Sequence, residues 1–234
     1  MILLALVVAT VLSYALGWEV GTPLLVPVFN TIAGFPFMVA ALRQGDAGRA
    51  ISRMLLWALV LAVCATLVSY AQPSRTETLF LRGASYRAEM FEWVLTGRGV
   101  ESDPARFIPQ QAMHAIVFAV LALASGGILA LAMGAVLMNY MGHYVGALAA
   151  VSAHPARMMM LGWHPWAVIR IASFVTIGVV LAVPALSWLG GFRVDARAAR
   201  RLLAWAGAGL VADVVLKWLL APAWQRLLLS GVGW

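Results

Sequence analysis

Four polar or charged side chains in strongly apolar surroundings are the residues of this sequence best suited to chemistry. Asn139 and His143 lie four residues apart, as do Asp213 and Lys217. Residues with this spacing share a helix face, and an acid four residues before a base is the favoured order for an ion pair. Polar groups are costly in hydrocarbon and usually face a partner or a cavity. The four residues are therefore candidates for a solute or ion path.

Each candidate also has a structural explanation. Asp213 and Lys217 could simply neutralise one another, and His143 could be hydrogen-bonded inside a helix bundle or lie at an interface. Arg170 lies near the start of an apolar segment, where its long side chain can extend to the membrane surface. The sequence alone leaves the structural and functional explanations open.

Cofactor chemistry is the least supported possibility. A haem held by two histidines would need His143 and a second histidine, such as His114, on opposite sides of the iron. His154, Met158 and His164 offer imidazole and thioether groups that suit copper. However, three consecutive methionines cannot share one helix face, and no thiolate lies beside them. We therefore predict no cofactor or metal, with haem and copper as alternatives.

Known catalytic motifs are absent from the sequence. It contains no G-x-x-x-x-G-K-[ST], H-E-x-x-H, G-x-S-x-G or G-x-G-x-x-G pattern, so nothing indicates an ATPase, a zinc protease, a serine hydrolase or a dinucleotide enzyme. The single cysteine, Cys64, excludes an intrachain disulfide and a CxxC site. We expect no enzyme activity, and an ATP-driven role would need a separate nucleotide-binding subunit.

Composition places the chain in a membrane. Hydrophobic residues make up 63% and charged residues 11% of the sequence, and mean hydropathy is +0.92. Soluble domains carry about 25% charged residues. The net charge of +7 does not indicate nucleic acid, because most of the basic residues outside the central polar region flank apolar segments and suit lipid head groups. These are Arg43, Arg49, Arg53, Arg193, Arg197, Arg200 and Arg201.

The apolar segments predict an all-α, polytopic membrane helix bundle that forms one domain over residues 1–234. A bilayer crossing needs about 20 apolar residues, so the chain has room for about six transmembrane helices, within a range of five to seven. Segments 2–17, 54–71, 166–190 and 202–221 are clear candidates. Segment 22–42 carries three prolines and is either an irregular, functional stretch or an ordinary kinked helix. Residues 72–106 form a polar extramembrane loop with an amphipathic interfacial helix near 84–97.

A ladder of small residues lies inside the charge-free stretch from residue 107 to residue 156. Its members recur every four residues, which lets another helix approach closely in lipid. This pattern predicts a tight helix–helix contact between about 126 and 146, with a partner either in this chain or in another. The ladder consists of Gly126, Ala130, Gly134, Met138, Gly142 and Gly146.

The membrane topology depends on whether residues 107–153 cross once or twice. Two crossings place the Arg-rich segments 43–53 and 191–201 on one side, whereas one crossing separates them. Basic loops are usually cytoplasmic. This favours two crossings when 43–53 is cytoplasmic, but one crossing with an external N-terminus would put 72–106 and 191–201 inside. Charge counting leaves both models open.

The leading functional hypothesis is a small permease or channel-like transport subunit of the cell inner membrane. The segment LGWHPWAVIR resembles the cytoplasmic coupling loop of ABC-transporter permeases over ten residues. It lacks the acidic residue that often opens that loop, since Pro155, Ala156 and Arg157 stand there, so no residue role is transferred. The alternative is a non-catalytic anchor or assembly subunit of a larger membrane complex, and the third is a metal- or haem-handling protein. Expected partners are the lipid bilayer and other membrane subunits or further copies of this chain.

Overall fold

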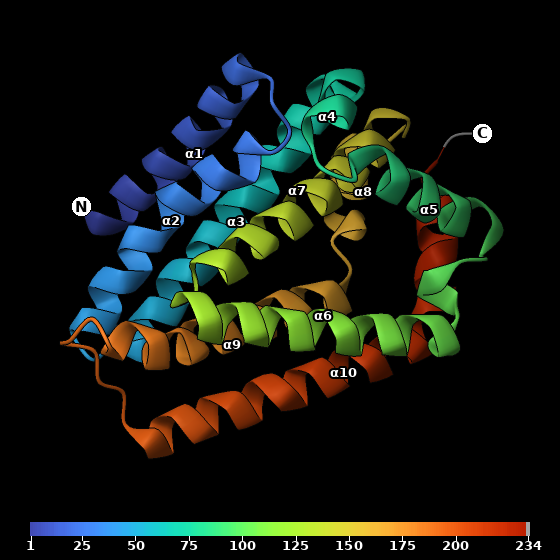
Figure 1. Cartoon of the computed structure of the whole chain (residues 1–234). Coiled ribbons are helices and arrows are strands. Elements are labelled where there is room, and N and C mark those ends of the chain that lie inside the picture. Colours follow the sequence, from blue (N-terminus) through green and yellow to red (C-terminus); the bar gives the residue numbers. More distant parts are fainter. Residues whose placement is uncertain (233–234) are drawn as a thin grey trace.

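Ten α-helices and one 3₁₀-helix build the protein in the computed structural model, which describes residues 1–232 (Figure 1). Within this range the only β pairing is an isolated bridge between Ser152 and Val232. The predicted all-α membrane bundle is therefore confirmed. In chain order the elements are α1 (Ile2–Val20), α2 (Leu25–Arg43), α3 (Ala47–Ala71), α4 (Pro73–Leu79), α5 (Gly83–Thr96), η1 (Val100–Ser102), α6 (Pro104–Ser125), α7 (Ile128–Ala150), α8 (Pro155–Gly162), α9 (Pro165–Ser187) and α10 (Ala196–Leu229).

Seven of these helices, α1, α2, α3, α6, α7, α9 and α10, are long and apolar enough to cross a membrane. The charge-free stretch supplies two of them, because the chain reverses at Gly126 and Gly127. Both glycines adopt left-handed backbone angles, with φ of 61° and 90°, which glycine reaches without steric cost. Gly126 therefore ends α6 and does not belong to the helix that carries the rest of the ladder.

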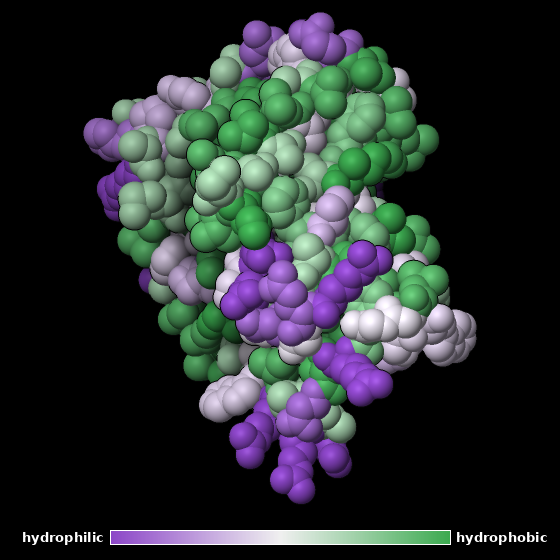
Figure 2. Space-filling view, turned by 90° about the vertical axis from the view of Figure 1, so that its left-hand side faces the viewer, coloured by the Kyte–Doolittle hydropathy of each residue, from purple (hydrophilic) through white to green (hydrophobic). Residues whose placement is uncertain are grey.

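The two Arg-rich segments lie on the same side, as the two-crossing model requires. The guanidinium carbon of Arg43, at the end of α2, lies 5.6 Å from the ring centroid of Phe192, in the turn before α10. Figure 2 shows this end of the molecule, with hydrophilic residues gathered over its middle and lower part. The one-crossing model is therefore wrong.

From Leu25 onward, segment 22–42 forms a continuous helix, α2, and Pro23 lies in the turn before it, so the alternative of an ordinary helix holds for this segment. Pro27 lies in the first turn of α2, where a backbone N–H has no acceptor within the helix in any case. Pro36 lies inside the helix and faces outward. Prolines at these two places remove few hydrogen bonds, which explains why the backbone is not broken.

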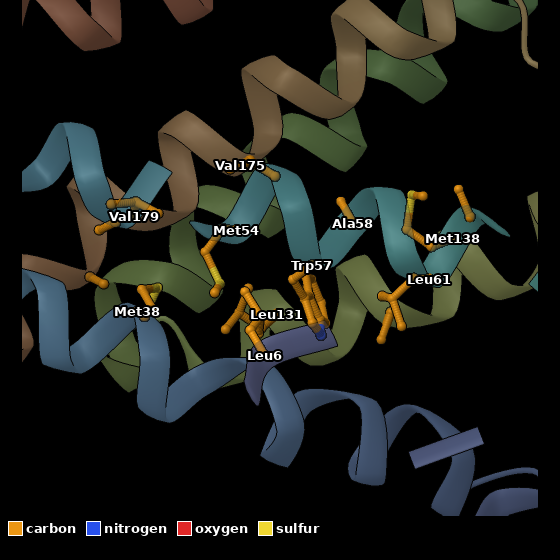
Figure 3. Packing of buried hydrophobic residues seen from close by; sticks show 14 of the residues in the cluster. Leu6, Met38, Met54, Trp57, Ala58, Leu61, Leu131, Met138, Val175 and Val179 are labelled. Carbon is orange, nitrogen blue, oxygen red and sulfur yellow. The ribbon is translucent and has the colours of Figure 1, made fainter. Parts of the chain in front are cut away.

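Trp57 on α3 is the centre of the largest hydrophobic core (Figure 3). Its side chain is 2% exposed, and its indole N–H donates to the carbonyl oxygen of Asn30 at 3.0 Å. A Cβ at Gly34 would lie 2.7 Å from the indole nitrogen. Gly34 therefore makes room for the tryptophan between α2 and α3.

The most extensive helix contact joins α3 and α7. A Cβ on Gly142 or Gly146 would lie under 3.0 Å from atoms of α3. At Gly134 the nearest atom is a Phe118 ring carbon at 3.8 Å. The ladder is thus not one uniform stripe, and the partner of its C-terminal half is α3 of the same chain.

The polar region 72–106 folds into α4, α5 and η1 and covers one end of the bundle. The predicted amphipathic helix forms as α5, which packs against α7 and the last part of α10. Its buried residues are Gly83, Met90, Trp93 and Val94, whereas Leu95 is 44% exposed. The last helix is longer than predicted: α10 has 34 residues, contains Pro222 and bends toward α5 (Figure 1).

Candidate functional site

Asn139 belongs to a buried hydrogen-bond network that joins α1, α2 and α7. Its amide nitrogen donates to Asn30 Oδ1 at 2.9 Å, and its oxygen accepts from the Tyr14 hydroxyl. Asn30 in turn donates to Ser13 Oγ at 2.8 Å. We call Ser13, Tyr14, Asn30 and Asn139 the asparagine network. Because both ends of each asparagine amide are paired, its evident role is to hold the three helices together.

His143 faces a different set of residues from Asn139. Its Nδ1 lies 3.1 Å from Thr76 Oγ1 and 3.3 Å from Ser69 Oγ, so it connects α7 with α3 and α4. Its Nε2 is buried and has no hydrogen-bond partner within residues 1–232. The predicted polar cluster of Asn139 and His143 is therefore split between two environments.

Asp213 and Lys217 do not pair with each other, so that prediction is wrong. Arg170 on α9 binds Asp213 through two parallel contacts, Nε to Oδ2 at 2.9 Å and Nη2 to Oδ1 at 3.0 Å. Lys217 Nζ lies 2.8 Å from Glu101 Oε1 on η1. Arg170 therefore does not extend to the membrane surface. Planar two-point contact with a carboxylate is the strongest arrangement open to a guanidinium, which explains why Asp213 pairs across helices.

Arg170, Lys217 and Glu101 line a cavity of about 80 Å³ between α6, α7, α9 and α10, to which α5 and η1 also contribute. That volume corresponds to about three water molecules. We call it the charged cavity. Gln111 on α6 donates to Asp213, and Asp213 itself does not line the wall. The polar groups on the wall are Tyr86, Glu101, Gln110, Gln111, His114, Tyr140, Arg170 and Lys217.

Glu101 on η1 and Tyr86 on α5, which line the charged cavity, have well-defined protonation states. Burial opposes ionisation of Glu101, but the charges of Lys217 and Arg170 outweigh it and hold the pKa of this carboxyl below its ordinary value. Burial raises the pKa of Tyr86 well above its ordinary range. At neutral pH Glu101 is thus an anion, and the Tyr86 hydroxyl keeps its proton and can donate it in a hydrogen bond.

An aromatic cluster with unused hydrogen-bonding capacity packs beside the charged cavity. The His164 ring stacks on Trp166 at 4.7 Å and lies 6.1 Å from Tyr144, measured between ring centroids. Tyr144 also contacts Tyr86 of the cavity wall, at 6.2 Å. His164 Nε2, the Tyr144 hydroxyl and Trp166 Nε1 are buried without a partner among residues 1–232. Burial lowers the pKa of His164 to about 4, so the ring is neutral at pH 7.

Arg82, in the turn before α5, has a strained backbone. Its φ of 60° is the only positive value at a non-glycine residue within 1–232. It precedes α5, whose first residue, Gly83, lies against the His143 ring: a Cβ there would be 3.3 Å from His143 Cδ2. Strained backbone is concentrated at functional sites. Sequence reasoning missed Glu101, because it lies among balanced charges in the polar region and only the fold brings it to the cavity.

The predicted metal candidates are not brought together. His154 is exposed, whereas Met158 is buried against the end of α10 and His164 lies in the aromatic cluster. His114 lines the charged cavity, so it does not stand opposite His143. No group of three or more His, Cys, Asp or Glu side chains within residues 1–232 is placed to hold a metal. The absence of a cofactor stays a prediction.

Comparison with known proteins assigns no function. The segment LGWHPWAVIR spans the end of α8 and the start of α9, and both His164 and Trp166 in it are buried, so it does not present an exposed docking loop. No protein-family model, curated protein or solved structure matches the chain. The functional argument rests on the geometry and charge of the cavity.

Proposed function

We propose that this chain is a membrane transport subunit of the permease type, with the charged cavity as its solute or coupling-ion site. The observation that supports this is the presence of Arg170, Lys217 and Glu101 on the wall of one cavity between membrane-spanning helices. Charged groups at such positions are rare and usually belong to substrate or ion pathways. His114, on the same wall, lies about 15 Å along α6 from its start, at the standard rise per residue.

A purely structural role does not account well for these ion pairs. Replacing a buried ion pair with well-packed apolar residues is often neutral or stabilising, so helix packing alone does not require four charges here. The asparagine network already shows how this protein joins helices with neutral groups. In the proposed transport role, the charges exchange partners when a solute or ion enters the cavity.

A double substitution tests the proposal without leaving a lone buried charge. We expect Glu101→Gln/Lys217→Met to fold but to lose transport. Purified protein would be reconstituted in vesicles and incubated with a cell metabolite extract, and the vesicle contents would then be measured by mass spectrometry. At least one solute should accumulate with the wild type and stay at the protein-free level with the double variant.

Gly134→Ala serves as the control, because it adds one methyl group away from the cavity, and it should transport like the wild type. Equal accumulation by wild type and double variant would remove the cavity from the mechanism. Accumulation by neither would argue against transport.

The assembly hypothesis gains no support from the Gly142–Gly146 face or from the apolar face of α5, two surfaces on which another subunit could have docked. The face of Gly142 and Gly146 is occupied by α3, and the apolar face of α5 packs on α7 and α10. Neither is left for another subunit. A scaffold would tolerate the double substitution and retain a co-purifying partner, so the same preparation distinguishes the two functions.

We further propose that the Arg-rich end, with the α2–α3 and α9–α10 turns, faces the cytoplasm of a cell with this protein in its inner membrane. Short basic loops are retained on that side. Gly48 is exposed at the start of α3. In a Cys64→Ala background, Gly48→Cys should react with a membrane-impermeant maleimide in inside-out vesicles and not in intact cells. The reverse result would invert the orientation.

A further inference from the structure

A second hollow, an apolar groove of about 620 Å³, runs along the outside of α3 and α9. Its wall includes Leu59, Val63 and Leu67 from α3 and Val168 from α9, and α8 contributes Met159 and Met160. Both α3 and α9 are membrane-spanning, so the groove opens toward hydrocarbon. Its size and apolar lining are typical of a binding pocket for a small hydrophobic molecule.

The groove and the charged cavity meet at Met138 and Ile171. These two residues line both hollows, one from α7 and the other from α9. The two helices barely touch each other, so side chains and not backbone separate the hollows. Methionine is unbranched and flexible, so Met138 is the boundary side chain best able to move aside.

We propose that the joined spaces bind a single-chain amphiphile of the fatty-acid class, with the acyl chain in the groove and the carboxylate in the charged cavity. The assignment deepens the proposed function, since it rests on the charged cavity being the transport site. An apolar compartment beside a small polar one matches a molecule with a long tail and a compact head.

The charges on the wall favour an anionic head group. Arg170 and Lys217 both reach the wall, whereas Glu101 is the one acid on it, because Asp213 lies behind Arg170. The volume of about 80 Å³ accepts a carboxylate of three heavy atoms and is too small for a glycerophosphate or a sugar.

Photo-crosslinking tests where the tail lies. The probe is palmitate with a diazirine near its methyl end, added to the protein in phosphatidylcholine vesicles, irradiated and mapped by peptide mass spectrometry. We expect labelling of α8 at Met159 and Met160 and of the Leu59–Leu67 part of α3. Excess palmitate should abolish this labelling, and hexadecanol, which lacks the charge, should not.

Two matched substitutions separate the groove from the general lipid-facing surface. Val168 lies in the groove and is 52% exposed, and Val120 on α6 lies outside it and is 57% exposed. Val168→Phe fills the groove and should reduce labelling at least about tenfold, the range in which a pocket rejects one ill-fitting group. Val120→Phe should label like the wild type. Equal labelling of both variants would show nonspecific lipid contact and overturn the inference.

The head-group assignment has its own outcomes. Glu101→Gln/Lys217→Met should lose the preference for palmitate over hexadecanol. Stronger competition by a monoacyl glycerophosphate than by palmitate would overturn the carboxylate assignment. Groove-specific labelling without solute accumulation would leave binding intact and refute transport. Accumulation without such labelling would support transport and refute the amphiphile.

Discussion

The asparagine network and the charged cavity both place polar side chains inside the bundle, yet they are built in opposite ways. In the network, Asn30 and Asn139 are neutral, and their amides are paired with neighbouring side chains. In the cavity, Arg170, Lys217 and Glu101 carry full charges on the wall of a hollow. The asparagine amides of the network bond to neighbouring side chains, whereas the polar groups of the cavity line a space of about 80 Å³.

Whether a polar side chain is neutral and fully paired, or charged and beside a cavity, distinguishes a structural role from a functional one better than polarity alone. A saturated neutral network stabilises one arrangement of helices. Charges beside a cavity keep alternative partners within reach, and the aromatic cluster with its unpaired groups contacts Tyr86 of the cavity wall through Tyr144. The network should therefore matter for stability alone, and the cavity for both stability and transport.

The largest effect should follow from leaving one cavity charge without its partner. Lys217→Met should lower the free energy of unfolding by about 3–5 kcal/mol, because Glu101 stays buried without a counter-charge. Adding Glu101→Gln should restore most of this loss but not transport. Thermal unfolding in detergent measures the stability of both variants. Equal stability of the single and double variants would show that the pair is not effectively buried.

Acid should loosen the cavity end before it affects the asparagine network. The pKa of His164 in the folded protein is about 4, and in the unfolded chain it is about 6.5. Between these values the unfolded chain binds the proton more readily, so stability falls as pH decreases from about 6.5 to 4, by on the order of 3 kcal/mol. The low pKa of Glu101 acts in the same direction at still lower pH.

Hydrogen exchange measured at pH 7 and pH 5 tests this prediction. Peptides around residues 86–101 and 161–170 should exchange faster at the lower pH, after correction for intrinsic rates, and peptides around 13–30 should not. His164→Phe keeps an aromatic ring and should remove most of the difference. Uniform acceleration along the chain would contradict a local origin.

A smaller effect is expected where α3 and α7 approach most closely. Gly146→Ala places a methyl group under 3.0 Å from Thr66 and Ser69 of α3 and should cost about 1–3 kcal/mol, typical of overpacking. Gly134→Ala has space and should be neutral or stabilising by up to about 1 kcal/mol, since alanine is the better helix former. Thermal unfolding of both compares them directly, and equal losses would argue against close packing at Gly146.

The smallest effect should come from the network itself. Asn139→Leu removes the partner of Tyr14 and Asn30 and should cost about 1–2 kcal/mol, near the upper end measured for polar contacts between membrane helices. Transport should be unchanged once expression is equalised. If vesicle uptake is lost while stability is retained, the division between network and cavity is wrong.

Sequence patterns were sufficient for the general architecture. Apolar segments of bilayer length lead directly to membrane helices, and the amphipathic pattern near 84–97 identified α5. The four-residue spacing of Gly142 and Gly146 indicated a close helix contact, because that spacing is a property of a single helix. Gly126 was misassigned to the same helix, since a small residue can be a packing surface or a left-handed turn and spacing does not distinguish them.

What the sequence determined by itself is the local part: which segments are helical, which faces are apolar, and that the solvent is lipid. Only the tertiary structure decided how the charges pair. Glu101 and Lys217 are 116 positions apart and Gln111 and Asp213 are 102 apart, so no helical periodicity relates them. Asp213 and Lys217 share a helix face, yet each binds a partner on another element, because helix packing brought a guanidinium and a carboxylate into better geometry than the helix itself offers.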